Sequence, residues 1–169
     1  MPTIRLSPTL LGRLPLSLPT GGTVQVPRLR LHCLARLPQF MMPRDGAVDT
    51  GAPFTCFPRS IWTRFREGTD FEWLPFEAGF QPPTGQLPGW QFTFRMARFL
   101  VPITLMDSST ELDRAEVIAQ FADGDPQTRR GQSLPWFVIG LWGGLLEGGR
   151  IAIGRDPASG QVTGELEFP

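Results

Sequence analysis

Apolar and polar residues alternate along several stretches of this 169-residue chain, as they do in β-strands that bury only one face. The alternation is clear over residues 23–33, 91–106 and 161–168, so we predict strands there. The second stretch is long enough for two antiparallel strands or one bent strand, and Pro27 in the first indicates a bulge. Further short strands are predicted at residues 40–49, 54–57, 136–139 and 150–154.

Helices are predicted to be few and short, because 18 prolines and 19 glycines interrupt the chain. One helical turn is expected after Pro58, and one short helix over residues 141–147. Residues 108–121 fit two interpretations, since a helix-capping signal begins the segment whereas residues 117–121 fit a strand. The fold class predicted from these elements is all-β.

A chain of this length fits one domain. We predict that residues 1–22, which are rich in Pro and Gly, form an N-terminal arm of one or two short extended pieces, partly mobile or packed at an edge. Residues 23–169 form the domain. Within it, residues 67–89 are a loop-rich excursion of Pro, Gly and aromatic residues, which we interpret as a mobile lid.

Composition and charge exclude several classes of function. The formal net charge is zero and the 16 arginines are scattered, so we expect no nucleic-acid partner. No stretch of about 20 apolar residues could span a membrane, so we expect no membrane partner and a cytoplasmic location. Cys33 and Cys56 are expected to be buried thiols rather than a disulfide. The single histidine, His32, fits an ordinary strand position, so no metal site and no cofactor are expected.

The run Gly46-Ala47-Val48-Asp49-Thr50-Gly51-Ala52 is the best candidate for chemistry, because a short apolar segment delivers a carboxylate directly into a turn of small residues. A carboxylate with little bulk water around it must be hydrogen-bonded, paired or partly neutralised. Thr50 can supply a hydroxyl group, and Gly51 permits the close approach of another backbone or a ligand. The alternative is a capped turn after a strand, since Asp, Thr and Gly all favour turns.

Two motifs together resemble those of the retropepsin-like aspartic proteases. Residues 48–52 match the catalytic turn of that family, and residues 137–140 match its hydrophobic-hydrophobic-Gly element about 90 residues later. The order of elements between the motifs also matches, and the resemblance covers residues 23–168. It implies a closed β-barrel with one short C-terminal helix and a Pro/Gly-rich lid.

The same resemblance implies an aspartic endopeptidase that acts on polypeptide substrates as a homodimer, because this chain carries one Asp-Thr-Gly turn and the family needs two. Asp49 of each subunit would hold the lytic water, and the two carboxylates would share a proton. Thr50 would lock the paired turns beneath the site, and Gly51 would admit the substrate backbone. Substrate contacts are expected at Ala52, Pro53 and Gly85.

Two departures from the family pattern concern substrate anchoring. Pro53 stands where viral members usually have an Asp, and it offers neither an N–H group nor a charge. Leu141 and Trp142 follow the late Gly140, where viral members commonly place Arg. Because both partners of one ion pair are replaced, we expect apolar contacts at the dimer or substrate rim. The counterpart of the flap, residues 80–89, contains three prolines and would be stiff.

Two alternatives remain beside the endopeptidase. One keeps the fold without hydrolysis, as a peptide-binding or scaffold module, because Pro53 and the stiff lid disturb the family pattern. The other is an unrelated β-barrel or sandwich in which Asp49 only caps a turn. The first two interpretations require Asp49 to lie beside residues 137–140 and near a two-fold axis, and the C-terminal hairpin, residues 150–168, is the expected dimer contact.

Overall fold

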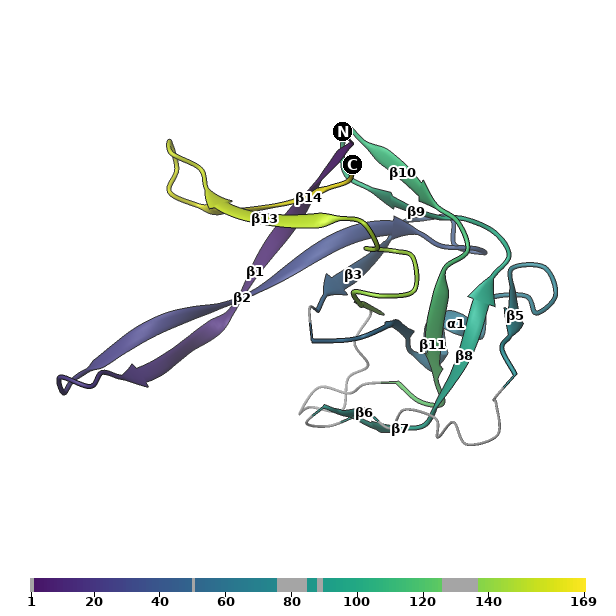
Figure 1. Cartoon of the computed structure of the whole chain (residues 1–169), viewed down its shortest axis with the longest axis horizontal. Coiled ribbons are helices and arrows are strands. Elements are labelled where there is room, and N and C mark those ends of the chain that lie inside the picture. Colours follow the sequence, from purple (N-terminus) through teal and green to yellow (C-terminus); the bar gives the residue numbers. More distant parts are fainter. Residues whose placement is uncertain (1, 50, 76–84, 88–89, 126–136) are drawn as a thin grey trace.

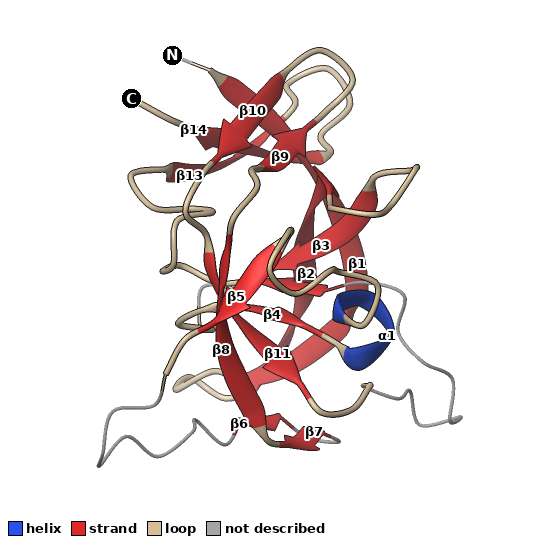
Figure 2. Cartoon of the chain, turned by 90° about the vertical axis from the view of Figure 1, so that its right-hand side faces the viewer, coloured by secondary structure: helices blue, strands red, loops and turns tan. Residues whose placement is uncertain are grey.

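The structure, a computed structural model, describes residues 2–49, 51–75, 85–87, 90–125 and 137–169 (Figure 1). This part of the chain is all-β, as predicted, and strands form most of it (Figure 2). The one helix described, α1 (Arg59–Trp62), begins directly after Pro58, where a helical turn was expected. No described helix has the length and apolar character needed to cross a membrane.

Most strands belong to one large sheet, whose hydrogen-bonded order is β13-β14-β1-β2-β3-β12-β4-β11-β8-β5, with β9 paired to β2 and β10 paired to β9. Their bounds are β1 Thr3–Ser17, β2 Thr23–Arg36, β3 Arg44–Val48, β4 Thr55–Phe57, β5 Phe71–Trp73, β8 Phe94–Phe99, β9 Ile103–Met106, β10 Glu111–Arg114, β11 Ile118–Ala122, β12 Phe137–Ile139, β13 Arg150–Arg155 and β14 Val162–Glu167. A separate two-stranded sheet contains β6 (Gly85–Leu87) and β7 (Trp90–Phe92).

The large sheet is strongly curved but does not close on itself in the described part of the chain. The strands at the two ends of its hydrogen-bonded order, β13 and β5, do not pair with each other. The closed barrel expected from the sequence is therefore not shown, whereas the all-β class is. Residues 108–121, which fitted two interpretations, form two strands, β10 and β11.

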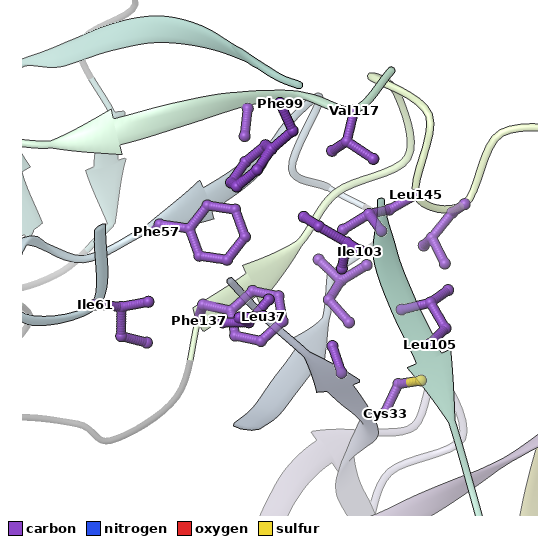
Figure 3. Packing of buried hydrophobic residues seen from close by; sticks show 14 of the residues in the cluster. Cys33, Leu37, Phe57, Ile61, Phe99, Ile103, Leu105, Val117, Phe137 and Leu145 are labelled. Carbon is purple, nitrogen blue, oxygen red and sulfur yellow. The ribbon is translucent and has the colours of Figure 1, made fainter. Parts of the chain in front are cut away.

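The core inside this curved sheet is rich in phenylalanine (Figure 3). Phe57 of β4 is fully buried and stacks on Phe137 of β12, with ring centroids 4.8 Å apart. Phe121 of β11 contacts Phe57 edge-on at 5.9 Å. Burial of each such side chain contributes about 1.5–3 kcal/mol to stability. These rings therefore hold β4, β11 and β12 against one another.

The first strand is longer and more integrated than the expected arm. Its residues Thr3–Leu6 pair with β14, and Ile4 and Leu6 belong to the core. From Ser7 onward β1 pairs with β2 in a long hairpin, which extends away from the rest of the chain in Figure 1. The expected boundary after residue 22 falls at the tip of this hairpin, between β1 and β2.

The helix expected over residues 141–147 is absent, because its backbone groups bond to other segments. The Gly143 carbonyl accepts a hydrogen bond from the N–H of Ile118 at 2.8 Å, and the Gly144 carbonyl accepts one from the Arg114 guanidinium at 2.8 Å. Gly143 and Gly144 also have φ values of 87° and 99°, in the left-handed region that a right-handed helix excludes. Tertiary hydrogen bonds thus replaced the helical ones.

Asp107, in the turn after β9, anchors the base of β1. Its carboxylate accepts hydrogen bonds from the backbone N–H groups of Arg5 at 2.7 Å, Ser109 at 2.7 Å and Thr110 at 2.8 Å. Desolvation opposes ionisation of this carboxyl group, but the hydrogen bonds outweigh it and lower the pKa of Asp107 to about 2. The ionised form therefore joins the N-terminal strand to the β9–β10 turn.

We predict that Asp107→Asn lowers the free energy of unfolding, and that the difference from the wild type depends on pH. Because the folded-state pKa lies below the ordinary value, the carboxylate stabilises the fold above about pH 5, and this effect fades as pH falls from about 4 to 2. Urea unfolding at a series of pH values would measure it. Glu147→Gln is the control, since its exposed carboxylate has no described hydrogen bond. A pH-independent difference would contradict the prediction.

Candidate active site

The candidate site is built where β12 lies between β3 and β4, the two strands that flank the turn beginning at Asp49. β12 pairs in parallel with β3, so that Ile139 lies opposite Val48. On its other edge β12 pairs antiparallel with β4 through Val138 and Cys56. Because β3 and β12 run in parallel, both end at the same edge of the sheet, and Asp49 and Gly140 are the next residues along each.

Asp49 is held at this edge by its backbone and by one carboxylate oxygen. Its N–H donates to the carbonyl of Ile139 at 3.0 Å, and its own carbonyl accepts from the N–H of Ala52 at 3.1 Å. The carboxylate Oδ1 accepts from the N–H of Gly51 at 2.9 Å. The last hydrogen bond fixes the orientation of the carboxylate, and it is also the bond that an aspartate capping a turn makes.

The Asp49 carboxylate is less enclosed than the sequence indicated, because the residue is only partly buried in the single chain. The one buried acidic residue among the described residues is Asp70 instead. Asp70 accepts hydrogen bonds from Gln39 Nε2 at 3.0 Å and from the N–H of Arg66 at 2.8 Å. Those partners fix the turn before β5, so Asp70 has a structural role that its surrounding sequence did not reveal.

Residues 140–142 form hydrogen bonds with the turn that follows Asp49 and with the start of β4. The N–H of Leu141 donates to the carbonyl of Ala52 at 3.0 Å, and the N–H of Trp142 donates to the carbonyl of Pro53 at 2.7 Å. The N–H of Gly140 donates to the hydroxyl of Thr55 at 3.3 Å. The two motifs therefore contact each other through strand pairing and the Asp49–Ile139 hydrogen bond, and these three further hydrogen bonds join the residues in and directly beside them.

Gly140 is required here by space. A Cβ atom at this position would lie 2.3–2.8 Å from the backbone carbon, oxygen and Cα atoms of Phe54. Atoms of the main chain cannot turn aside as the end of a flexible side chain can, so any side chain would push the two segments apart. The glycine of the hydrophobic-hydrophobic-Gly motif is thus explained by the close passage of residues 140 and 54.

The rim of the site is apolar at the two positions where the sequence departs from the family pattern. Trp142 is 64% exposed, and its ring meets that of Phe54 edge-on with centroids 6.2 Å apart. Leu141 and Pro53 are exposed beside it. Backbone hydrogen bonds and one aromatic contact therefore join the turn to the segment after Gly140, with no ion pair among these residues.

The structure brings together four of the six predicted site residues: Asp49, Gly51, Ala52 and Pro53. Thr50 and residues 76–84 and 88–89 of the expected lid lie outside the described residues. The backbone of Gly85 pairs with Phe92 in the two-stranded sheet of β6 and β7. Strand pairing thus places this part of the expected lid in a hairpin and does not join it to the turn at Asp49.

Other reactive groups offer less to chemistry. Cys33 and Cys56 are free and buried, as predicted, and burial raises the pKa of each thiol to about 12. Each thiol stays protonated at neutral pH and is a poor nucleophile or metal ligand. Among the described residues, no group of three or more His, Cys, Asp or Glu side chains could hold a metal ion.

Strand pairing also gives His32 surroundings that the sequence did not reveal. Its Nδ1 lies 2.9 Å from Oδ2 of Asp45 on the neighbouring strand β3, and its side chain is 11% exposed. Both residues line a hollow of about 300 Å³, together with Arg5, Ser7, Leu34, Met106, Asp107 and Ser108. His32 therefore lies close to Asp45 on the outer face of the sheet, away from the core, although its Nδ1 makes no hydrogen bond of good geometry there.

We predict that Gly140→Ala destabilises the fold by about 2 kcal/mol or more, because the added methyl group meets backbone atoms of Phe54. Thermal unfolding followed by circular dichroism would measure this. Gly154→Ala in the outer strand β13 is the control, since its Cβ would meet only the end of the Thr163 side chain at 3.3 Å. Equal melting temperatures for the two variants would contradict the close approach.

The assembled features are a carboxylate of fixed orientation, a turn tied to a second motif about 90 residues away, and an apolar rim. These features are local geometry, and local geometry alone does not assign a family. Comparisons of this chain with protein-family models, with curated proteins and with solved structures found no match.

Proposed function

We propose that this chain is an aspartic endopeptidase of the retropepsin-like kind, which hydrolyses peptide bonds as a homodimer with Asp49 of each subunit at a shared site. The resemblance in two sequence motifs suggested this function, and the contact between the same two motifs in space supports it. We also propose that the fold is a retropepsin-like barrel and that β6 and β7 belong to its lid.

The observation that carries the proposal is the hydrogen bond from the N–H of Asp49 to the carbonyl of Ile139. An aspartate that only caps a turn needs no partner from a strand about 90 residues later. Here that strand fixes the Asp49 backbone, and Gly51 fixes the carboxylate. A catalytic carboxylate needs such rigid support, because small misplacements of a reacting group cost large factors in rate.

Two copies of Asp49 would divide the proton transfers of the reaction. The ionised carboxylate takes a proton from water as the water oxygen attacks the peptide carbonyl carbon, and the protonated carboxylate gives its proton to the carbonyl oxygen. The tetrahedral diol then collapses, a proton passes to the amide nitrogen, and the C–N bond breaks. Two close carboxylates suit these roles, because they cannot both ionise cheaply and so share one proton.

The single chain leaves room for this partner. Asp49 is only partly buried, and the exposed rim around it is formed by Leu141, Trp142 and Pro53. A second copy would complete the enclosure of the carboxylates, and an apolar rim suits substrates with apolar side chains. We therefore expect cleavage between apolar residues in preference to charged ones.

A peptide-binding module without hydrolysis is the second candidate, and one observation favours it. Pro53 ends the turn where the family usually has a donor for the substrate backbone, and its nitrogen carries no hydrogen. The carbonyl of Pro53 is also engaged by the N–H of Trp142. Binding of a statine-type peptide, which mimics the tetrahedral diol, at a site that cleaves no peptide would support this candidate.

We predict that Asp49→Asn lowers kcat for peptide cleavage by about 10³-fold or more, because an amide cannot exchange a proton with water or with the leaving group. Cleavage of a diverse peptide library by the purified full chain, analysed by mass spectrometry, is the measurement. The wild type should be most active at mildly acidic pH and lose activity when both carboxylates are ionised.

Asp45→Asn is the matched control. Asp45 lies on β3, the strand that leads to Asp49, but its side chain contacts His32. This variant should keep the activity of the wild type. Full activity of Asp49→Asn would end the proposal, and so would activity in the wild type that no statine-type peptide inhibits.

A further inference from the structure

Within the described part of the chain, the strands of the long hairpin that projects from the body pair with no third strand. We define the arm as residues 7–30, which comprise β1 from Ser7, the turn at residues 18–22, and β2 as far as Arg30. β14 pairs with β1 only as far as Leu6, and β3 pairs with β2 only as far as Leu31. The strands of the arm thus pair only with each other, and a lone two-stranded hairpin is marginally stable in water.

The arm is unusually apolar for such an exposed element. Eight aliphatic side chains on it are 37–58% exposed: Leu10, Leu11, Leu14, Leu16, Leu18, Val24, Val26 and Leu29. Toward the tip these side chains lie on one face, because Leu14 pairs with Val26 and Leu16 pairs with Val24. The next pair along, Ser17 and Thr23, is polar and lies on the opposite face. Clustered exposed aliphatic residues of this kind mark an interaction surface.

The arm is suited to binding through its faces and not by adding a strand to its edges. Pro8 and Pro15 lie in β1 and Pro27 lies in β2. Proline has no N–H to donate to a new strand, and exposed edges with proline resist pairing with another sheet. The apolar face therefore remains as the part of the arm available to a partner.

Charge identifies the partner's chemistry. The arm contains three arginines and no acidic residue, whereas the rest of the chain contains 13 arginines and all 16 acidic residues. On the arm, the exposed Arg13 has no partner among the described residues. The body of a second copy carries the excess of negative charge that complements this basic, apolar element.

Position leads to the same partner. The arm starts where β3 ends, because Val48 lies opposite Leu31 and Asp49 follows Val48. A second copy that brought its own Asp49 to this edge of the sheet would meet the arm. The C-terminal hairpin offers less, since residues 164–167 of β14 are already paired on both edges, and Leu166 and Phe168 are buried in their own core.

We propose that the arm clasps the body of a second copy of this chain, with its apolar face toward the partner, and that this contact holds the dimer together. The inference rests on the proposed function in so far as a shared Asp49 site requires two copies. It replaces the C-terminal hairpin as the expected dimer contact. In the dimer, each arm would lie beside the shared site and cover aliphatic residues that are otherwise exposed to water.

The test compares two double variants of the full chain that receive the same new side chains. Leu16→Gln with Val24→Gln alters the apolar face, and Ser17→Gln with Thr23→Gln alters the polar face of the adjacent pair. Sedimentation velocity over a concentration series would give the dissociation constant of each dimer. We expect the first variant to raise it by about 30-fold or more, because it removes apolar burial from the contact. The second should stay within about threefold of the wild type.

Three results would overturn the arm contact: a wild type that is monomeric at every concentration, equal weakening by both variants, or unchanged association of the first variant. Binding to vesicles of phosphatidylcholine and phosphatidylglycerol is measured as well. A monomeric wild type that sediments with them, and loses this binding in the first variant, would assign the apolar face to a membrane surface instead.

Peptide cleavage measured on the same samples separates this inference from the proposed function. If the chain dimerises through the arm but cleaves no peptide, the endopeptidase proposal fails and the arm contact stands. If the chain cleaves peptides and the first variant dimerises like the wild type, the arm contact fails and the endopeptidase proposal stands. Circular dichroism of both variants checks that the fold is kept.

Discussion

The insertion of β12 between β3 and β4 is the constraint on which the rest of the structure depends. β3 and β4 are separated by only a short turn, yet they do not pair with each other, because a strand from about 90 residues later occupies the space between them. Such a contact is costly to form, since a long loop must close before the pairing is gained. Once formed, it fixes Phe137 against Phe57 below the turn and fixes Asp49 above it. One strand thus joins the stability of the core to the geometry of the candidate site.

Local patterns predicted the strands well, and they failed where distant segments decide the outcome. Residues 161–168 alternate because one face is buried, and this signal survives without knowledge of the partner strands. Residues 141–147 have a composition compatible with a helix, but their carbonyl groups bond to Ile118 and Arg114, which no local signal could show. The length of the N-terminal strand β1 was underestimated for a related reason. Its prolines read as breaks, although a proline on an unpaired strand edge interrupts nothing.

The candidate site was predicted in part. The resemblance of two sequence motifs to those of a family led us to expect Asp49 beside residues 137–140, and the parallel pairing of β3 with β12 brings them together. The burial of Asp70 and the contact of His32 with Asp45 could not be predicted from the sequence, because both depend on strand register and turn packing. The distribution of charge was a further signal in the sequence. The net charge of zero did not show it, because a basic N-terminal segment and an acidic remainder cancel each other.

The pairing of Thr3–Leu6 with β14 has a consequence for how the chain matures during synthesis. β1 leaves the ribosome well before β14, the strand that covers Ile4 and Leu6. Translation at about 5–20 residues per second leaves roughly 8–30 seconds in which Ile4 and Leu6 lack this covering strand. During that interval the apolar side chains of β1 are exposed and can be bound by cellular chaperones. The order of the strands along the chain therefore makes protection of β1 during synthesis as much a requirement of this fold as the packing of its core.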